Sequence, residues 1–99
     1  MQNIQDAWAA VAAGQYAAAA GFAQRAMALY PGSADLYRLL AVASFQQGLD
    51  QEAVAAYRQL TQLQPAVASH WQDLATAARA AQQTELAREA YTKAISLGA

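Results

Sequence analysis

The chain has 99 residues, of which 57% are hydrophobic and 13% are charged, and its formal net charge is -1. This composition excludes a disordered segment, and the abundance of alanine, the best helix former, predicts a helical domain. The near-zero net charge offers no basic field to a phosphate backbone, so we expect no nucleic-acid partner.

Cysteine is absent, which excludes disulfide bonds and every zinc site that needs thiolate ligands. No apolar stretch approaches the roughly 18 residues that suggest a membrane-spanning helix. The first residues, MQNIQDAW, have neither the basic flank nor the apolar core of a signal peptide. We therefore expect no membrane span and a cytoplasmic location, and the second expectation fails if the chain is a piece of a longer protein.

Apolar residues at helical spacing, interrupted by glycine and proline, predict six helices and no strands. In chain order, the helices are expected over residues 3–13, 16–29, 34–47, 51–63, 66–81 and 85–97. Gly14 and Gly48 end the first and third helices, because glycine tolerates the left-handed backbone that often closes a helix. Pro31 and Pro65 follow the second and fourth helices, since proline cannot continue a helix.

Polar side chains at three predicted helix starts suggest N-caps. Ser33, Asp50 and Thr84 directly precede the third, fourth and sixth helices, and each carries an oxygen that can accept a hydrogen bond from the first turn. In the turn before the sixth helix, Gln82 stands where the two earlier turns have glycine. That turn either costs about 1 kcal/mol in a left-handed conformation or takes a different shape.

Similar residues recur at a fixed interval of 34 positions. The pairs are Tyr37 and Trp71, Leu40 and Leu74, Ala41 and Ala75, Ala53 and Ala87, Tyr57 and Tyr91, and Leu63 and Leu97. A period of this size is typical of repeat proteins, in which each unit stacks on its neighbours and shares a core with them. We expect the alanines to let paired helices approach closely and the aromatic residues to fill the gaps between layers.

The order of these residues resembles the tetratricopeptide repeat family. The second and third units each have an aromatic residue, two further residues, a leucine and a small residue, and later an alanine, three residues and a second aromatic. The resemblance implies an all-α protein, an α-solenoid of three antiparallel helix pairs wound into a right-handed superhelix. The repeats cover about 1–33, 34–67 and 68–99 of a single domain, 1–99.

Both ends of the predicted stack depart from the pattern. Asn3 and Asp6 stand where the other repeats have the first aromatic and the leucine, and Ala23 replaces the second aromatic, so the register of the first helix stays open. At the other end, no polar helix follows to cover Leu86 and Ile95. Such an apolar end suggests self-association through the last helix, or a missing next helix.

In the resembled family, the first helix of each pair lines the inside of the superhelix and holds peptide segments of partner proteins. By the 34-residue step, the matching positions are Ile4, Arg38 and Gln72, then Trp8, Val42 and Thr76, then Val11, Phe45 and Arg79. Within each helix these residues are spaced i, i+4, i+7 and share one face. We expect an apolar floor in the first two repeats and a polar, cationic end in the third.

These positions also predict the chemistry of the partner. Trp8, Val42 and Phe45 favour an apolar or amphipathic peptide, and Arg38 and Arg79 can hold an acidic side chain or a C-terminal carboxylate. The carboxylate clamp of some chaperone-binding family members is absent, since the matching positions carry Ile4, Trp8, Leu39, Ser69 and Asp73. The simpler alternative is that Trp8 and Phe45 only pack between helices.

An enzyme is the least favoured alternative. His70 is the only histidine, and it comes three residues before Asp73, a spacing at which the two side chains can in principle transfer protons. No nucleophile, second histidine or metal-ligand spacing accompanies the pair, so we interpret His70 as a surface residue. The glycines are isolated and form no phosphate-binding loop. We expect no catalysis, no metal and no cofactor.

The sequence therefore predicts a protein–protein interaction module, an adaptor, scaffold or chaperone-like domain that binds a peptide or helix of a partner protein in a concave groove. The alternative is a structural or oligomerisation arm of a larger protein, which could itself be catalytic. Light scattering separates the two, because a monomer with an accessible groove favours peptide capture.

Overall fold

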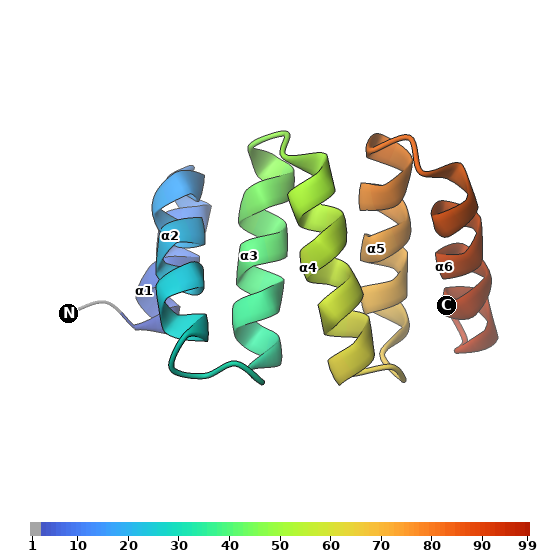
Figure 1. Ribbon diagram of the computed structural model, residues 1–99, viewed down its shortest axis with the longest axis horizontal. Helices are drawn as coiled ribbons and strands as arrows, with labels where there is room; N and C mark the ends of the chain where they lie inside the picture. The colour runs from blue at the N-terminus through green and yellow to red at the C-terminus, as the bar shows by residue number, and fades with distance from the viewer. Residues whose placement is uncertain (1–2) are drawn as a thin grey trace.

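The computed structural model describes residues 3–99, which form six helices and contain no strand. The helices are α1 (Ile4–Ala12), α2 (Tyr16–Met27), α3 (Ala34–Gln46), α4 (Asp50–Leu63), α5 (Ala68–Ala80) and α6 (Thr84–Ser96). They follow one another in a row 41 Å long, and each helix contacts the next (Figure 1). The all-α solenoid predicted from the sequence is confirmed.

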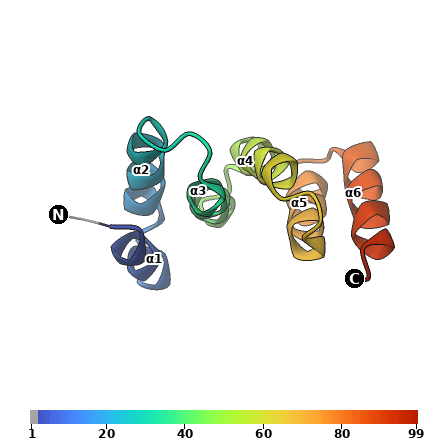
Figure 2. The ribbon, with the colours of Figure 1, turned by 90° about the horizontal axis from the view of Figure 1, so that it is seen from below.

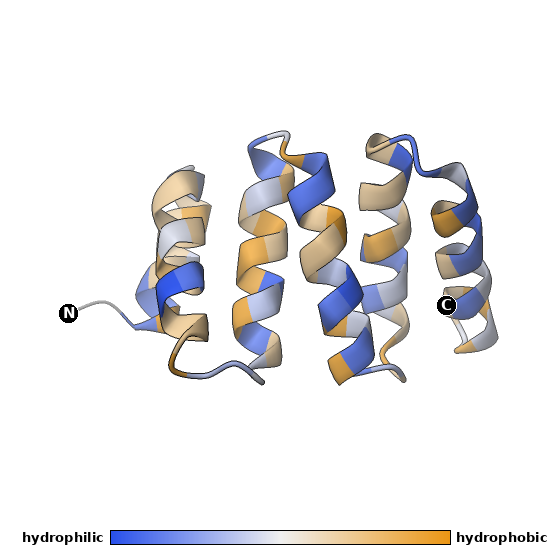
Figure 3. Ribbon diagram, viewed as in Figure 1, coloured by the Kyte–Doolittle hydropathy of each residue, from blue (hydrophilic) through white to orange (hydrophobic). Residues whose placement is uncertain are grey.

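The row of helices is arched, and the ends of the arch turn toward the same side (Figure 2). In this view α2 and α4 lie toward one side of the row, while α1 and α5 lie toward the other. Beyond the contacts between neighbours, α1 also contacts α3. Hydrophobic and hydrophilic residues are mixed along the ribbons of α3 and α4 (Figure 3), as expected for helices that bury one stripe.

The three turns inside the helix pairs share one backbone geometry. Gly14, Gly48 and Gln82 have positive φ angles of 80°, 77° and 62°. The next residue of each turn donates its backbone N–H to a carbonyl in the preceding helix: Gln15 to Ala10 at 2.8 Å, Leu49 to Ser44 at 2.9 Å and Gln83 to Ala78 at 2.8 Å. Gln82 therefore keeps the left-handed shape, at a cost of about 1 kcal/mol relative to glycine, and the alternative of a different turn is wrong.

The predicted caps are confirmed at one helix and wrong at two. The backbone N–H of Leu36 donates to Ser33 Oγ at 3.3 Å, as expected. Asp50 and Thr84 are instead the first residues of α4 and α6, and the residues before them make no side-chain cap hydrogen bond. An unpredicted capping box starts α1, where the side chains of Asn3 and Asp6 each accept from the other's backbone N–H.

The core consists of two hydrophobic clusters. The larger cluster lies among α3, α4, α5 and α6, and the smaller one among α1, α2 and α3. Leu40 packs against both clusters and so links the first repeat to the others. The four alanines that recur at 34-residue spacing, Ala41, Ala53, Ala75 and Ala87, are all buried. Their small size permits the close approach of the helices.

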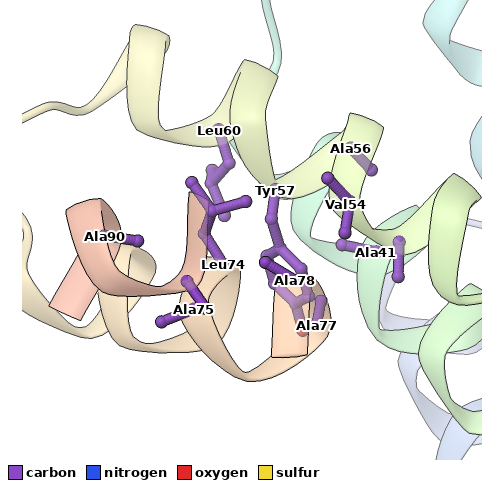
Figure 4. Close-up of a cluster of buried hydrophobic side chains, with 12 residues drawn as sticks. Ala41, Val54, Ala56, Tyr57, Leu60, Leu74, Ala75, Ala77, Ala78 and Ala90 are labelled. Atoms are coloured by element: carbon purple, nitrogen blue, oxygen red, sulfur yellow. The ribbon is translucent and has the colours of Figure 1, made fainter. Parts of the chain in front are cut away.

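Tyr57, Leu60 and Leu74 form the centre of the larger cluster (Figure 4). Tyr57 reaches from α4 toward α5, and Leu60 lies beside Leu74 of that helix. Each of these side chains is almost completely removed from water. The aromatic residue and the leucine of the repeat pattern thus fill the space between successive helices.

The C-terminal end of the row is open. Ile95 is 69% exposed and Tyr91 is 36% exposed, whereas Leu86 is half-buried against the larger cluster. One repeat earlier, the equivalent residues Thr61 and Tyr57 are buried. The difference arises because α5 covers α4, whereas among residues 3–99 the only helix that α6 contacts extensively is α5.

Candidate partner-binding face

The nine residues predicted for partner binding lie on α1, α3 and α5, and none is fully buried. Six of them are half-buried: Ile4, Trp8, Val11, Val42, Phe45 and Thr76. The other three, Arg38, Gln72 and Arg79, are exposed. The apolar members therefore lie in the first two helices of the set and the exposed polar members mostly in the third.

A contact between Trp8 and Arg38 joins the first two helices of this set. The Arg38 guanidinium carbon lies 4.3 Å from the centre of the Trp8 ring, within the range of a cation–π interaction. No described carboxylate lies within ion-pairing distance of Arg38. The Trp8 ring thus holds the Arg38 guanidinium in place, while the Arg38 side chain remains exposed to solvent.

Trp8 and Phe45 also contribute to the core. Trp8 packs against the smaller cluster and Phe45 against the larger one, although each keeps part of its surface in solvent. The alternative in which these residues pack between helices is therefore correct in part. Their remaining exposed surface is what a partner could contact.

A polar group formed by Tyr57 of α4 and by His70 and Asp73 of α5 lies near enough to Arg38 to feel its charge. The prediction that His70 is a surface residue is wrong, because the side chain is only 8% exposed. Its Nε2 is 2.7 Å from Gln64 Oε1, so the neutral ring donates from Nε2, and Nδ1 is buried with no partner among residues 3–99. A signal for this burial existed: the equivalent residue one repeat earlier is Leu36, which is also buried.

Burial shifts the titration of this polar group. Burial lowers the pKa of His70; the negative charge of Asp73 opposes this shift, and the positive charge of Arg38 adds to it more weakly. Burial also raises the pKa of Asp73, with His70 and Arg38 opposing it. The pKa of Tyr57 rises to about 12, first because of burial and second because of Asp73. The neutral forms are favoured because even partial removal of a charge from water is costly.

Lowering the pH from about 7.5 to about 5.5 is expected to destabilise the protein through His70. The folded-state pKa of His70 lies below the unfolded value, so stability present above about pH 6.5 is lost as the pH falls through the folded pKa. The raised pKa of Asp73 acts in the opposite sense, because its protonation favours the folded state. Urea unfolding midpoints measured across this range test the prediction.

The control for this pH series is His70→Gln, which removes the chain's only histidine. The variant should lose the share of the pH dependence that comes from imidazole protonation. An unchanged fall in the variant would show that His70 does not carry the effect.

His70 and Asp73 have no nucleophile beside them in the contacts described above, and the His70 ring is engaged by Gln64. No group of three or more potential metal ligands occurs in the part of the chain that the structure covers. Of the helices described, none combines the length and apolar character needed to cross a membrane.

Two cavities that the sequence analysis missed lie beside α2. One, of about 500 Å³, lies between α2 and the α3–α4 pair and includes Tyr37 and Leu40 in its wall. The other, of about 670 Å³, lies at the start of α1, the end of α2 and the start of α3. Ile4 belongs both to the wall of this second cavity and to the predicted partner-binding face.

Comparison with known families decides the classification. The family model described as tetratricopeptide repeat matches residues 10–78, more than half of the chain. The chain belongs to the tetratricopeptide repeat family. The match runs from within α1 into α5 and confirms the resemblance read from the sequence. No curated protein matches the chain.

Tetratricopeptide repeats generally mediate protein–protein interactions and are typically non-catalytic. Membership of the family therefore supports a partner that is a protein. It identifies neither the partner nor the residues that contact it.

Proposed function

We propose that the tetratricopeptide face formed by α1, α3 and α5 binds a peptide or helix of a partner protein, so that the chain works as an adaptor or scaffold. The main support is the contact at 4.3 Å between Trp8 of α1 and Arg38 of α3. It brings residues of two successive repeats together on one partly exposed surface. A continuous surface across repeats is what an extended partner segment requires.

The side chains of this face suggest an amphipathic partner segment. Val42 and Phe45 are half-buried, so a partner can cover the remaining apolar surface at little cost in ordering. Arg38 and Arg79 are exposed and can pair with acidic side chains of the segment or with a terminal carboxylate. The Trp8 ring holds the Arg38 guanidinium, which reduces the entropy lost when an anion binds.

The direct test is to select peptides that bind the protein from a random library and to measure their affinity for the double variant Val42→Ser, Phe45→Ser. We expect the affinity to fall at least about tenfold, because two apolar contacts are lost. The helical circular dichroism should persist. The variant Val42→Ser alone serves if the loss of Phe45 from the core weakens folding.

The matched control for this test is Leu49→Ser, Leu63→Ser, which removes two exposed apolar side chains from outside the proposed face. This control should bind the selected peptides with unchanged affinity. Equal affinities of the two double variants would show that the partner binds elsewhere.

A second candidate function, an oligomerisation arm, is supported by the open end of α6. Ile95 and Tyr91 are exposed where the equivalent residues of the second repeat are buried beneath α5. A second copy or an attached domain could cover this surface. Light scattering at increasing protein concentration distinguishes the two functions, since a persistent monomer excludes assembly through α6.

A further inference from the structure

The cavity at the start of α1 has a mostly apolar wall. Its apolar lining residues are Ile4, Phe22, Ala26, Leu29, Tyr30 and Leu36. Arg25 and Asp35 add one charge of each sign to the wall. The volume of about 670 Å³ is within the range of sites that hold small ligands.

Comparison with the second repeat suggests why this space is open. Two positions beside it carry small residues where the next repeat carries large ones: Asn3 corresponds to Tyr37, and Ala26 corresponds to Leu60. Leu60 is almost completely buried in the larger cluster, and Tyr37 packs against that cluster. The first repeat lacks both side chains, so the volume that they would occupy remains open.

The third repeat indicates which kind of side chain this space suits. Trp71 holds the position equivalent to Asn3, and its ring centre is 6.0 Å from Lys93 Nζ. The residue of the first repeat equivalent to Lys93 is Arg25, which lines the cavity. An aromatic ring in the cavity would therefore meet a cation, as Trp71 does in the third repeat.

We propose that this cavity holds an aromatic side chain of the partner segment, packed on Phe22 and Tyr30 and facing the Arg25 guanidinium. The inference rests on the proposed function, because the partner segment reaches the cavity from the binding face at Ile4, which borders both. The guest replaces the aromatic residue that the first repeat lacks at Asn3. It acts as an anchor that fixes the register of the segment on the face.

The probe for this site is N-acetyl-tryptophanamide, with N-acetyl-leucinamide and N-acetyl-glutaminamide as comparisons. Amide shifts of the labelled protein should change around Phe22, Ala26 and Leu36 with the tryptophan derivative, at a dissociation constant on the order of millimolar. Leucinamide should bind more weakly and glutaminamide should not bind. The variant Arg25→Gln should weaken binding of the tryptophan derivative about two- to fivefold.

The variant Ala26→Leu fills the cavity with the side chain that the second repeat carries at the equivalent position, so it should abolish probe binding. Its control is Ala80→Leu, which makes the same substitution at an exposed position of α5 and should leave binding unchanged. If Ala26→Leu fails to fold, Asn3→Trp restores the missing aromatic residue and should also block the probe.

Three results would overturn this site: binding that survives both filled variants, shift changes confined to other regions, or equal binding of all three probes. Self-association that Ala26→Leu abolishes would assign the cavity to a second copy and would also overturn it. The probes are single residues, so their binding does not depend on the face around Val42 and Phe45. Failure of the proposed function is therefore distinguishable from failure of this site.

Discussion

Replacing Leu74 by alanine is expected to lower the free energy of unfolding by about 2–5 kcal/mol. The side chain is 1% exposed and lies between α4 and α5 in the larger cluster, so its removal leaves a cavity that the helices cannot close. Because a domain of this size is stable by only about 5–15 kcal/mol, the change is a large share of the total. Urea denaturation followed by circular dichroism measures it.

The control for Leu74→Ala is Leu63→Ala, which removes the same atoms from a side chain that is 41% exposed. We expect a loss below about 1 kcal/mol for the control, since much of the Leu63 side chain already contacts water. Similar losses for the two variants would contradict the assignment of Leu74 to the shared core.

Replacing Tyr57 by alanine is expected to cost about 3–5 kcal/mol, and replacing Tyr91 should cost far less. The two tyrosines occupy the same repeat position 34 residues apart, but Tyr57 is 6% exposed beneath α5 and Tyr91 is 36% exposed at the open end. The difference measures what stacking one repeat on the next contributes to stability. Thermal and urea unfolding of both variants supply the comparison.

Equal losses for Tyr57→Ala and Tyr91→Ala would mean that the open end of α6 is covered in solution. Light scattering on the unmodified chain would then show whether a second copy provides the cover. A large loss at Tyr57 alone supports a monomer whose repeats stabilise one another only inside the row.

The repeat period predicted the fold because the recurring residues are those that touch neighbouring helices. Ala41 and Ala75 recur where backbones approach closely, and both are completely buried. Leu40 and Leu74 occupy the same repeat position. Leu74 is buried in the core, whereas Leu40 is half-buried and packs against both clusters. A single sequence thus carries the architecture in the spacing of its small and large apolar residues.

The caps at Asp50 and Thr84 were wrong because the turn, rather than a side chain, sets where the helix begins. After the left-handed residue, Leu49 has φ -86° and ψ 71°, and Gln83 has nearly the same angles. That geometry makes the residue directly after the left-handed position the N-cap in both turns. Side-chain preference at helix starts, considered alone, does not include this constraint.

The site was only partly predictable from the sequence. Helical spacing placed Trp8, Arg38 and Val42 on partly exposed surfaces, because that inference needs only the periodicity of a helix. The burial of His70 depends on contacts between helices and on its hydrogen bond to Gln64, which spacing along one helix does not show. The cavity at the start of α1 is bordered by the small residues Asn3 and Ala26, and their small size becomes apparent only by comparison with Tyr37 and Leu60 of the second repeat.

The most direct test of the proposed binding face is to map amide chemical shifts while the protein is titrated with a peptide selected from the random library. We predict that the largest changes fall on α1, α3 and α5, around Trp8, Arg38, Val42 and Thr76. Changes confined to α2, α4 and α6, with those four residues unaffected, would contradict the proposal that the first helices of the repeats hold the partner.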